Sequence, residues 1–122
     1  MKNKEQTLHD FWSQFNVKAY DESTVPEDAV LPRITYEVVT DSFGYEVGMT
    51  ASIWDRSRSW ESVTDILHRI EHTISRGGQT LPYEGGMMWI KKGSPFAQRM
   101  ADTDDSIRRI VLNINVEYIS EE

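Results

Sequence analysis

The last part of the sequence alternates between apolar and polar residues over an unusually long stretch, Ile107–Ile119. One set of alternate positions is apolar (Ile110, Leu112, Ile114, Val116 and Tyr118), and the set between them is mixed (Arg109, Val111, Asn113, Asn115 and Glu117). A period of two residues indicates a β-strand with one buried face. Because that face must pack against a second layer, the sequence predicts a sheet covered on one side.

Three other segments predict further strands of this sheet. Arg33–Thr40 and Tyr45–Trp54 both alternate, and Asp41–Gly44 between them has the composition of a hairpin turn. Gly86–Lys92 predicts another strand, followed by a long irregular excursion over Gly93–Ser106.

Two segments have the periodicity of amphipathic helices. Glu5–Asn16 carries large apolar residues three and four positions apart (Leu8, Phe11, Trp12 and Phe15), and Thr7 is one candidate for its cap. Trp60–Arg76 has a similar stripe (Trp60, Val63, Ile66, Leu67, Ile70 and Ile74). Ser59 is a suitable N-cap for this second helix, and Gly77–Gly78 predicts its end.

The order of these elements predicts an α+β fold over residues 1–122 as a single domain. Two successive strand pairs favour an antiparallel sheet of about four strands, with two helices packed on one face (order α-β-β-α-β-β). The opposite face would be mixed and open to water or to another chain. It would carry Thr35, Glu37, Thr50, Ser52, Trp54, Asn113, Asn115 and Glu117.

Composition narrows the classes of partner. The net charge is −7, and nucleic acids and acidic membranes attract basic surfaces, so we expect neither as a partner. The chain has no cysteine, which excludes disulfides and thiolate metal sites. The first residues are polar and the longest apolar run is Met87–Ile90, so we expect no signal peptide and no membrane span.

One motif resembles catalytic chemistry. His68-Arg69-Ile70-Glu71-His72 matches the H-x-x-E-H pattern, in which two histidines bind zinc and the glutamate acts as base. At about 100° per residue both histidines point away from the apolar stripe, toward solvent, and no third ligand is evident. A zinc hydrolase is therefore the last-ranked alternative, and we expect no enzyme activity, no cofactor and no metal.

The sequence instead favours contacts with other proteins. Trp54 falls on the mixed face of a predicted strand, and exposed tryptophan is favoured where proteins bind one another. The segment Gly93–Ser106 combines apolar side chains with charges of both signs, and its acids can pair with neighbouring arginines. Tyr20–Pro32, another long connection, contains four acids, and connections of such length are often functional. The predicted contact residues are Trp54, Phe96, Arg99, Met100, Asp104, Asp105, Arg108 and Arg109.

The stretch Thr35–Ser120 resembles the tail-terminator, or tail-completion, proteins of long-tailed bacteriophages and prophages, and the minor capsid proteins encoded beside them. The resemblance is carried by Leu81-Pro82-Tyr83-Glu84-Gly85-Gly86, by Pro95-Phe96-Ala97-Gln98-Arg99-Met100, and by Asp104-Asp105-Ser106-Ile107-Arg108-Arg109. It implies a virion subunit that forms a six-fold ring, which caps the tail tube and joins it to the head connector. Its partners would be further copies of itself, the tube protein and the connector, and its location the virion tail or the host cytoplasm.

An alternative from a different class remains open. The chain could be a small cytoplasmic protein-binding or ligand-binding α+β module without catalytic activity. Self-association separates this alternative from the ring subunit.

Overall fold

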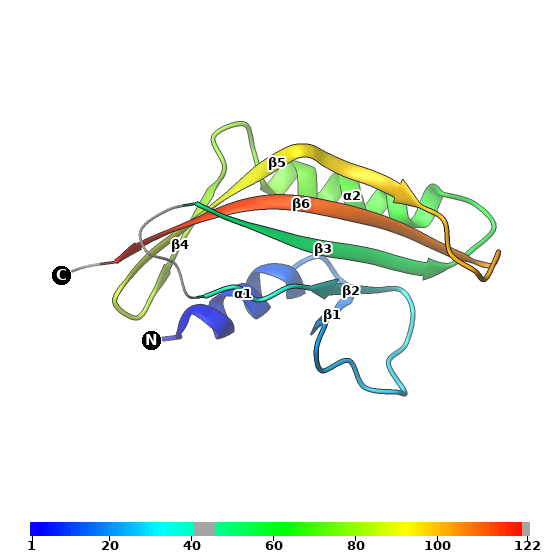
Figure 1. Ribbon diagram of the computed structural model, residues 1–122, viewed down its shortest axis with the longest axis horizontal. Helices are drawn as coiled ribbons and strands as arrows, with labels where there is room; N and C mark the ends of the chain where they lie inside the picture. The colour runs from blue at the N-terminus through cyan, green and yellow to red at the C-terminus, as the bar shows by residue number, and fades with distance from the viewer. Residues whose placement is uncertain (41–45, 121–122) are drawn as a thin grey trace.

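The computed structural model describes residues 1–40 and 46–120, which form two helices and one six-stranded sheet (Figure 1). The elements are α1 (Lys4–Ser13), β1 (Lys18–Asp21), β2 (Arg33–Tyr36), β3 (Val47–Arg56), α2 (Glu61–Thr73), β4 (Gln79–Tyr83), β5 (Gly86–Met100) and β6 (Ile107–Ser120). Within the described part of the chain, neither helix combines the length and apolar character that a bilayer span requires.

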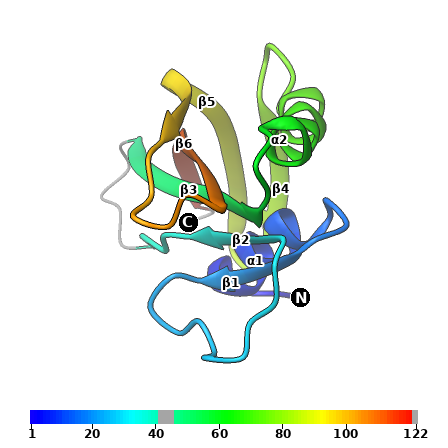
Figure 2. The same cartoon turned by 90° about the vertical axis from the view of Figure 1, so that its right-hand side faces the viewer.

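The strands lie in the order β1-β2-β3-β6-β5-β4. β1 pairs with β2 in parallel, and every other neighbouring pair is antiparallel. The sheet curls into a half-barrel with both helices on its concave side (Figure 2). α2 packs on β3 and β6, while α1 lies between the two edge strands and contacts both β1 and β4.

The hydrophobic core fills the space between the concave face and the helices. The five apolar positions predicted for the final strand (Ile110, Leu112, Ile114, Val116 and Tyr118) are all buried, as predicted. They meet Leu8, Phe11 and Trp12 of α1 and Val63, Ile66 and Ile70 of α2 within one cluster of buried residues. Each such side chain stabilises the fold by about 1.5–3 kcal/mol through burial.

The two helices begin and end at different residues from those predicted. Asn3 caps α1, because its side chain accepts from the Gln6 N–H while the Gln6 side chain accepts from the Asn3 N–H. Thr7 is instead buried inside the helix. α2 starts at Glu61, and Ser59 contributes through its hydroxyl, which accepts from the Glu61 N–H at 3.0 Å.

The predicted fold class, an antiparallel sheet of about four strands in the order α-β-β-α-β-β, is wrong. The sheet has six strands and is mixed. The two additional strands, β1 and β4, are its edges. They have four and five residues, and β4 contains Pro82, so neither displays the long alternation that identifies a strand in sequence.

The bounds of the central strands also differ. The predicted excursion Gly93–Ser106 is wrong over most of its length, because β5 continues to Met100 after a register shift between Lys92 and Ala97. At this shift β5 approaches β6 closely: a Cβ atom added to Gly93 would lie 2.8 Å from the Asn113 carbonyl oxygen. β2 ends at Tyr36, and the predicted turn Asp41–Gly44 lies outside the described residues.

Candidate interaction surface

A row of cationic and large apolar side chains crosses the convex face of the sheet. Direct cross-strand partners place Lys18 of β1 beside Arg33 of β2, Arg33 beside Trp54 of β3, Trp54 beside Arg109 of β6, and Arg109 beside Met100 of β5. Residues paired in this way share one face of a sheet. We call these five residues the arginine row.

Trp54 is the centre of the arginine row. Its indole N–H donates to the Thr35 hydroxyl oxygen at 2.9 Å, which fixes the ring against the sheet. The Arg109 guanidinium lies 4.4 Å from the ring centroid and that of Arg33 lies 6.0 Å from it, both within the range of cation–π attraction. The Arg109 Nε–H also donates to the Ser52 hydroxyl at 3.1 Å.

These contacts explain why two polar residues of the convex face are buried. Thr35 and Ser52 were predicted to lie on a face open to water or to another chain, but they are buried beneath the side chains that their hydroxyls hold. The row therefore rests on a second layer of hydrogen-bonded hydroxyls. A surface held in this way presents preorganised side chains, which reduces the entropy lost on binding.

On the concave face of the sheet, near the loop that joins β5 to β6, a second tryptophan lies beside two arginines. The ring of Trp60, the residue before α2, lies 4.7 Å from the Arg99 guanidinium and 5.4 Å from that of Arg108. Arg108 donates to the carbonyl oxygens of Asp105 and Arg58, at 2.7 and 3.0 Å. Its buried Nε has no hydrogen-bond partner among residues 1–40 and 46–120.

The loop 101–106 closes this end between β5 and β6. The side chain and the backbone N–H of Ser106 both donate to Asp104, and together with the weaker effect of Arg56 they lower the pKa of the Asp104 carboxyl. Asp104 pairs with Arg56 at 3.4 Å rather than with Arg99, Arg108 or Arg109. Asp105 is exposed in the same loop.

Six arginines lie at this end of the sheet, in a protein whose net charge is −7. Apart from Arg56, these arginines have no carboxylate within 4.0 Å in the described part of the chain. The arginines are Arg33, Arg56, Arg58, Arg99, Arg108 and Arg109, and the acids of the same end include Asp55, Asp102, Asp104 and Asp105, with Glu27 and Asp28 in the loop that leads into Arg33. Unpaired arginines beside aromatic rings are enriched where proteins bind one another.

An acidic loop adjoins the β1 end of the arginine row, because it leads from β1 into Arg33 of β2. Residues 22–32 connect β1 to β2 and project beyond the β1 edge of the sheet (Figure 2). Glu22, Glu27 and Asp28 are exposed in it, and so is Val30, whose side chain is 59 % exposed. The base of the loop is held by Arg33, which donates to the Ala29 carbonyl oxygen at 3.2 Å. We call residues 22–32 the acidic loop.

The fold brings the predicted contact residues into separate groups. Trp54, Arg109 and Met100 share the arginine row, while Arg99 and Arg108 lie around Trp60 on the other face and Asp104 and Asp105 lie in the closing loop. Phe96 belongs to neither face cluster, because it is half-buried against the core beside Lys92. Sequence reasoning missed Lys18 and Arg33.

The H-x-x-E-H motif lies on α2 with His68 and His72 exposed, on the solvent side where the helical periodicity placed them. Among residues 1–40 and 46–120, no three His, Asp or Glu side chains gather closely enough to hold a metal ion.

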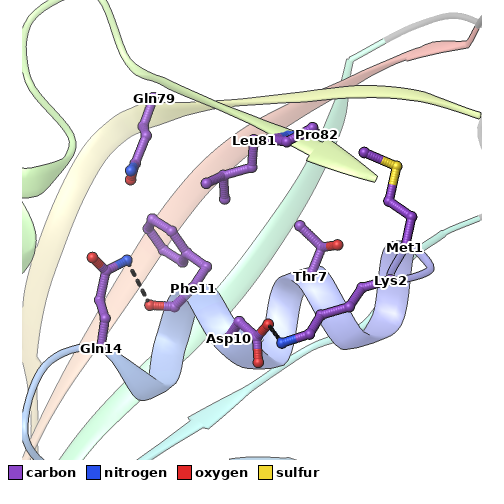
Figure 3. A pocket seen from close by; sticks show the side chains of 9 residues that line it. All are labelled: Met1, Lys2, Thr7, Asp10, Phe11, Gln14, Gln79, Leu81 and Pro82. Carbon is purple, nitrogen blue, oxygen red and sulfur yellow. Dashed lines mark hydrogen bonds and ion pairs between the residues drawn. The ribbon is translucent and has the colours of Figure 1, made fainter. Parts of the chain in front are cut away.

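A groove with a cavity volume of about 430 Å³ separates α1 from the edge strand β4. Phe11 and Leu81 supply apolar walls, and Figure 3 shows the Gln79 carboxamide directed from β4 toward α1. The buried Gln79 Oε1 has no hydrogen-bond partner within the described residues. Lys2 and Asp10 form an ion pair at one side of the groove (Figure 3).

Comparisons with known proteins give a structural likeness. No protein-family model matches the sequence, and no curated protein matches it either. A chain from the solved structure "Virion of native gene transfer agent (GTA) particle" has a similar fold, with a TM-score of 0.56. The two chains are 13 % identical, and the match covers 95 % of this chain and 91 % of the other.

Proposed function

We propose that this protein is a structural subunit of a phage-like virion, and that it acts at the end of the tail. The observation that carries the proposal is the fold, which corresponds over nearly the full length of both chains to that of a chain in a gene transfer agent virion. The match extends over 95 % of this chain and 91 % of the other, so the likeness is not confined to one shared motif.

The more specific role comes from the sequence resemblance to tail-completion proteins. In that role, copies of the chain form a ring that caps the tail tube and joins it to the head connector, and the subunit catalyses no reaction. A ring subunit contacts its two neighbours through two different surfaces. The arginine row and the acidic loop are two such surfaces of opposite charge.

The deciding experiment is an in-frame deletion in cells that carry the gene, complemented from a plasmid. We expect the deletion to abolish complete particles and to leave separate heads and tubes. Quantitative mass spectrometry of particles from complemented cells should find this protein at a fixed ratio to the tube protein. Normal particles that contain none of the protein would refute the proposal.

The ring itself is tested by multi-angle light scattering over a wide concentration range. A discrete species of about six subunits is the expected outcome, because closed rotational symmetry gives one defined size. Negative-stain electron microscopy of the same sample would distinguish a ring from an open chain. A continuous distribution of sizes would contradict a closed ring.

The groove between α1 and β4 supports a second candidate, a ligand-binding module. Its volume of about 430 Å³ falls within the range of small-molecule sites, and Gln79 Oε1 is an acceptor in need of a donor. NMR titration with small amides and alcohols tests this candidate. Shifts confined to the Leu81 methyls and the Gln79 side-chain amide would support it, and unchanged spectra would exclude it.

A further inference from the structure

We propose that the acidic loop of one copy of this protein binds the arginine row of a second copy. The inference rests on the proposed function, since it names the contact by which ring subunits would join. It is carried by the charges, the exposed apolar groups and the positions of the two surfaces.

The charges of the two surfaces are complementary. The row presents Lys18 and Arg109 beside the half-buried Arg33, which also donates to the Ala29 carbonyl oxygen, and the loop presents Glu22, Glu27 and Asp28. None of these six residues has an ion-pair partner in the described part of its own chain. Complementary charges steer association and fix the register in which two surfaces meet.

Each surface also presents an apolar anchor. Val30 of the loop is 59 % exposed and Met100 of the row is 41 % exposed, and the Trp54 ring lies in the same row. Exposed apolar side chains surrounded by charge are typical of protein contacts, where tryptophan often dominates the binding energy and methionine adapts to its partner. In the proposed contact, Val30 of the loop therefore packs against Met100 or Trp54 of the row.

The positions of the two surfaces favour a contact between copies. Arg33 fixes the base of the loop at the β1 edge, and the loop projects away from the sheet, whereas the row runs across the convex face to Met100 of β5 (Figures 1 and 2). A contact between two different patches is heterologous, so each copy offers a loop to one neighbour and a row to the other. Repetition of such a contact closes a ring when the rotation between neighbouring copies divides a full turn.

Nucleic acid is the competing occupant of the row, because phosphates also bind arginine. The net charge of −7 opposes that partner, and a nucleic acid would leave the acidic loop without a role. The two occupants make different predictions for changes in the loop.

The test is a charge swap. The loop variant carries Glu27→Lys and Asp28→Lys, the row variant carries Lys18→Glu and Arg109→Glu, and the control carries Arg76→Glu and Glu84→Lys, two exposed positions elsewhere. Light scattering and native mass spectrometry measure assembly. We expect each swapped variant alone to assemble at least about tenfold more weakly than wild type, and the control to match it. An equimolar mixture of the two swapped variants should regain assembly with a 1:1 composition.

The dependence of assembly on salt concentration is an independent test. Assembly of the wild-type protein should weaken from low to high salt, since screening shortens the range of attraction between exposed charges. Circular dichroism establishes that each variant is folded. If Arg109→Glu disrupts the sheet, Arg109→Gln with Lys18→Glu removes the charge more gently and should weaken assembly in the same direction.

Four results would overturn the inference. The first three are unchanged assembly of both swapped variants, a mixture that remains monomeric, and loss of assembly in the row variant alone, which would mean that the row contacts a part of the second copy other than the acidic loop. A wild-type protein that stays monomeric at millimolar concentration also overturns it. That last result leaves the virion proposal to the deletion experiment, so the two failures are distinguishable.

Discussion

The hydrogen bond from Trp54 to Thr35 allows a quantitative test of how the arginine row is supported. Trp54→Phe keeps an aromatic ring beside Arg109 but removes the N–H that donates to the Thr35 hydroxyl at 2.9 Å. Thr35 is 7 % exposed, so water replaces the lost donor poorly. An unsatisfied buried polar group costs about 1–3 kcal/mol, and the weaker cation–π contact of Phe adds about 0.5 kcal/mol.

We therefore expect Trp54→Phe to lower the free energy of unfolding by about 2 kcal/mol. For a domain of this size, that loss lowers Tm by about 6–12 °C. Urea unfolding followed by far-UV circular dichroism is the assay, because the substitution changes the fluorescence itself. The protein is kept dilute, since self-association would make stability depend on concentration.

The control is a double-mutant cycle with Thr35→Val, which removes the acceptor and keeps the branched shape. Replacing both partners leaves no unsatisfied hydroxyl, so the double mutant should be more stable than the sum of the single losses predicts, by about 1 kcal/mol. Strictly additive losses would refute the reasoning, because they would show that the bond between Trp54 and Thr35 contributes nothing to the support of the row.

Three further substitutions test the core, the close approach of two strands, and a buried phenol. Trp12→Ala, at a side chain 1 % exposed, should cost about 3–5 kcal/mol in urea unfolding, and a loss below about 1 kcal/mol would contradict the packing of α1. Gly93→Ala should cost about 1–3 kcal/mol because its Cβ would meet the Asn113 carbonyl oxygen at 2.8 Å, and an unchanged Tm would exclude that approach. Burial raises the pKa of Tyr118 to about 12 from 10.0, so the phenol ionises at lower pH in the unfolded chain than in the folded one. The free energy of unfolding should therefore fall by about 1 kcal/mol per pH unit from pH 10 to pH 12. Tyr118→Phe should flatten this decline at alkaline pH. At neutral pH it should cost about 1 kcal/mol, because it removes the hydrogen bond to the Val39 carbonyl oxygen. If the decline is unaltered in this variant, other groups cause it.

The sequence predicted the long elements because each buries one whole face. Ile110–Tyr118 alternate over enough residues for a period of two to be unambiguous, and all five apolar positions are buried. β1 and β4 were not predicted, since four or five residues leave too little pattern. β4 and β5 are joined directly by Glu84 and Gly85, but the contacts of α1 with β4 link segments that are distant in sequence.

The arginine row could be predicted only in part for the same reason. Trp54 and Arg109 were identified as contact residues, but their position beside Arg33 and Lys18 depends on the register between strands that are distant in sequence. The sequence does predict that Arg108 and Arg109 lie on opposite faces of the sheet, because they are consecutive residues of one strand. The structure accordingly places Arg108 at Trp60 and Arg109 at Trp54.

β6 lies between β3 and β5 in the middle of the sheet, although it is the last strand along the chain. During synthesis β3 therefore leaves the ribosome well before the strand that covers its edge, and an unpaired edge is a template for aggregation. The contacts of β6 with β3 also span a large sequence separation, which slows folding. The nascent chain consequently cannot complete its sheet until residues 107–120 have emerged, and the exposed edge of β3 makes the interval before then the one in which aggregation competes most strongly with folding.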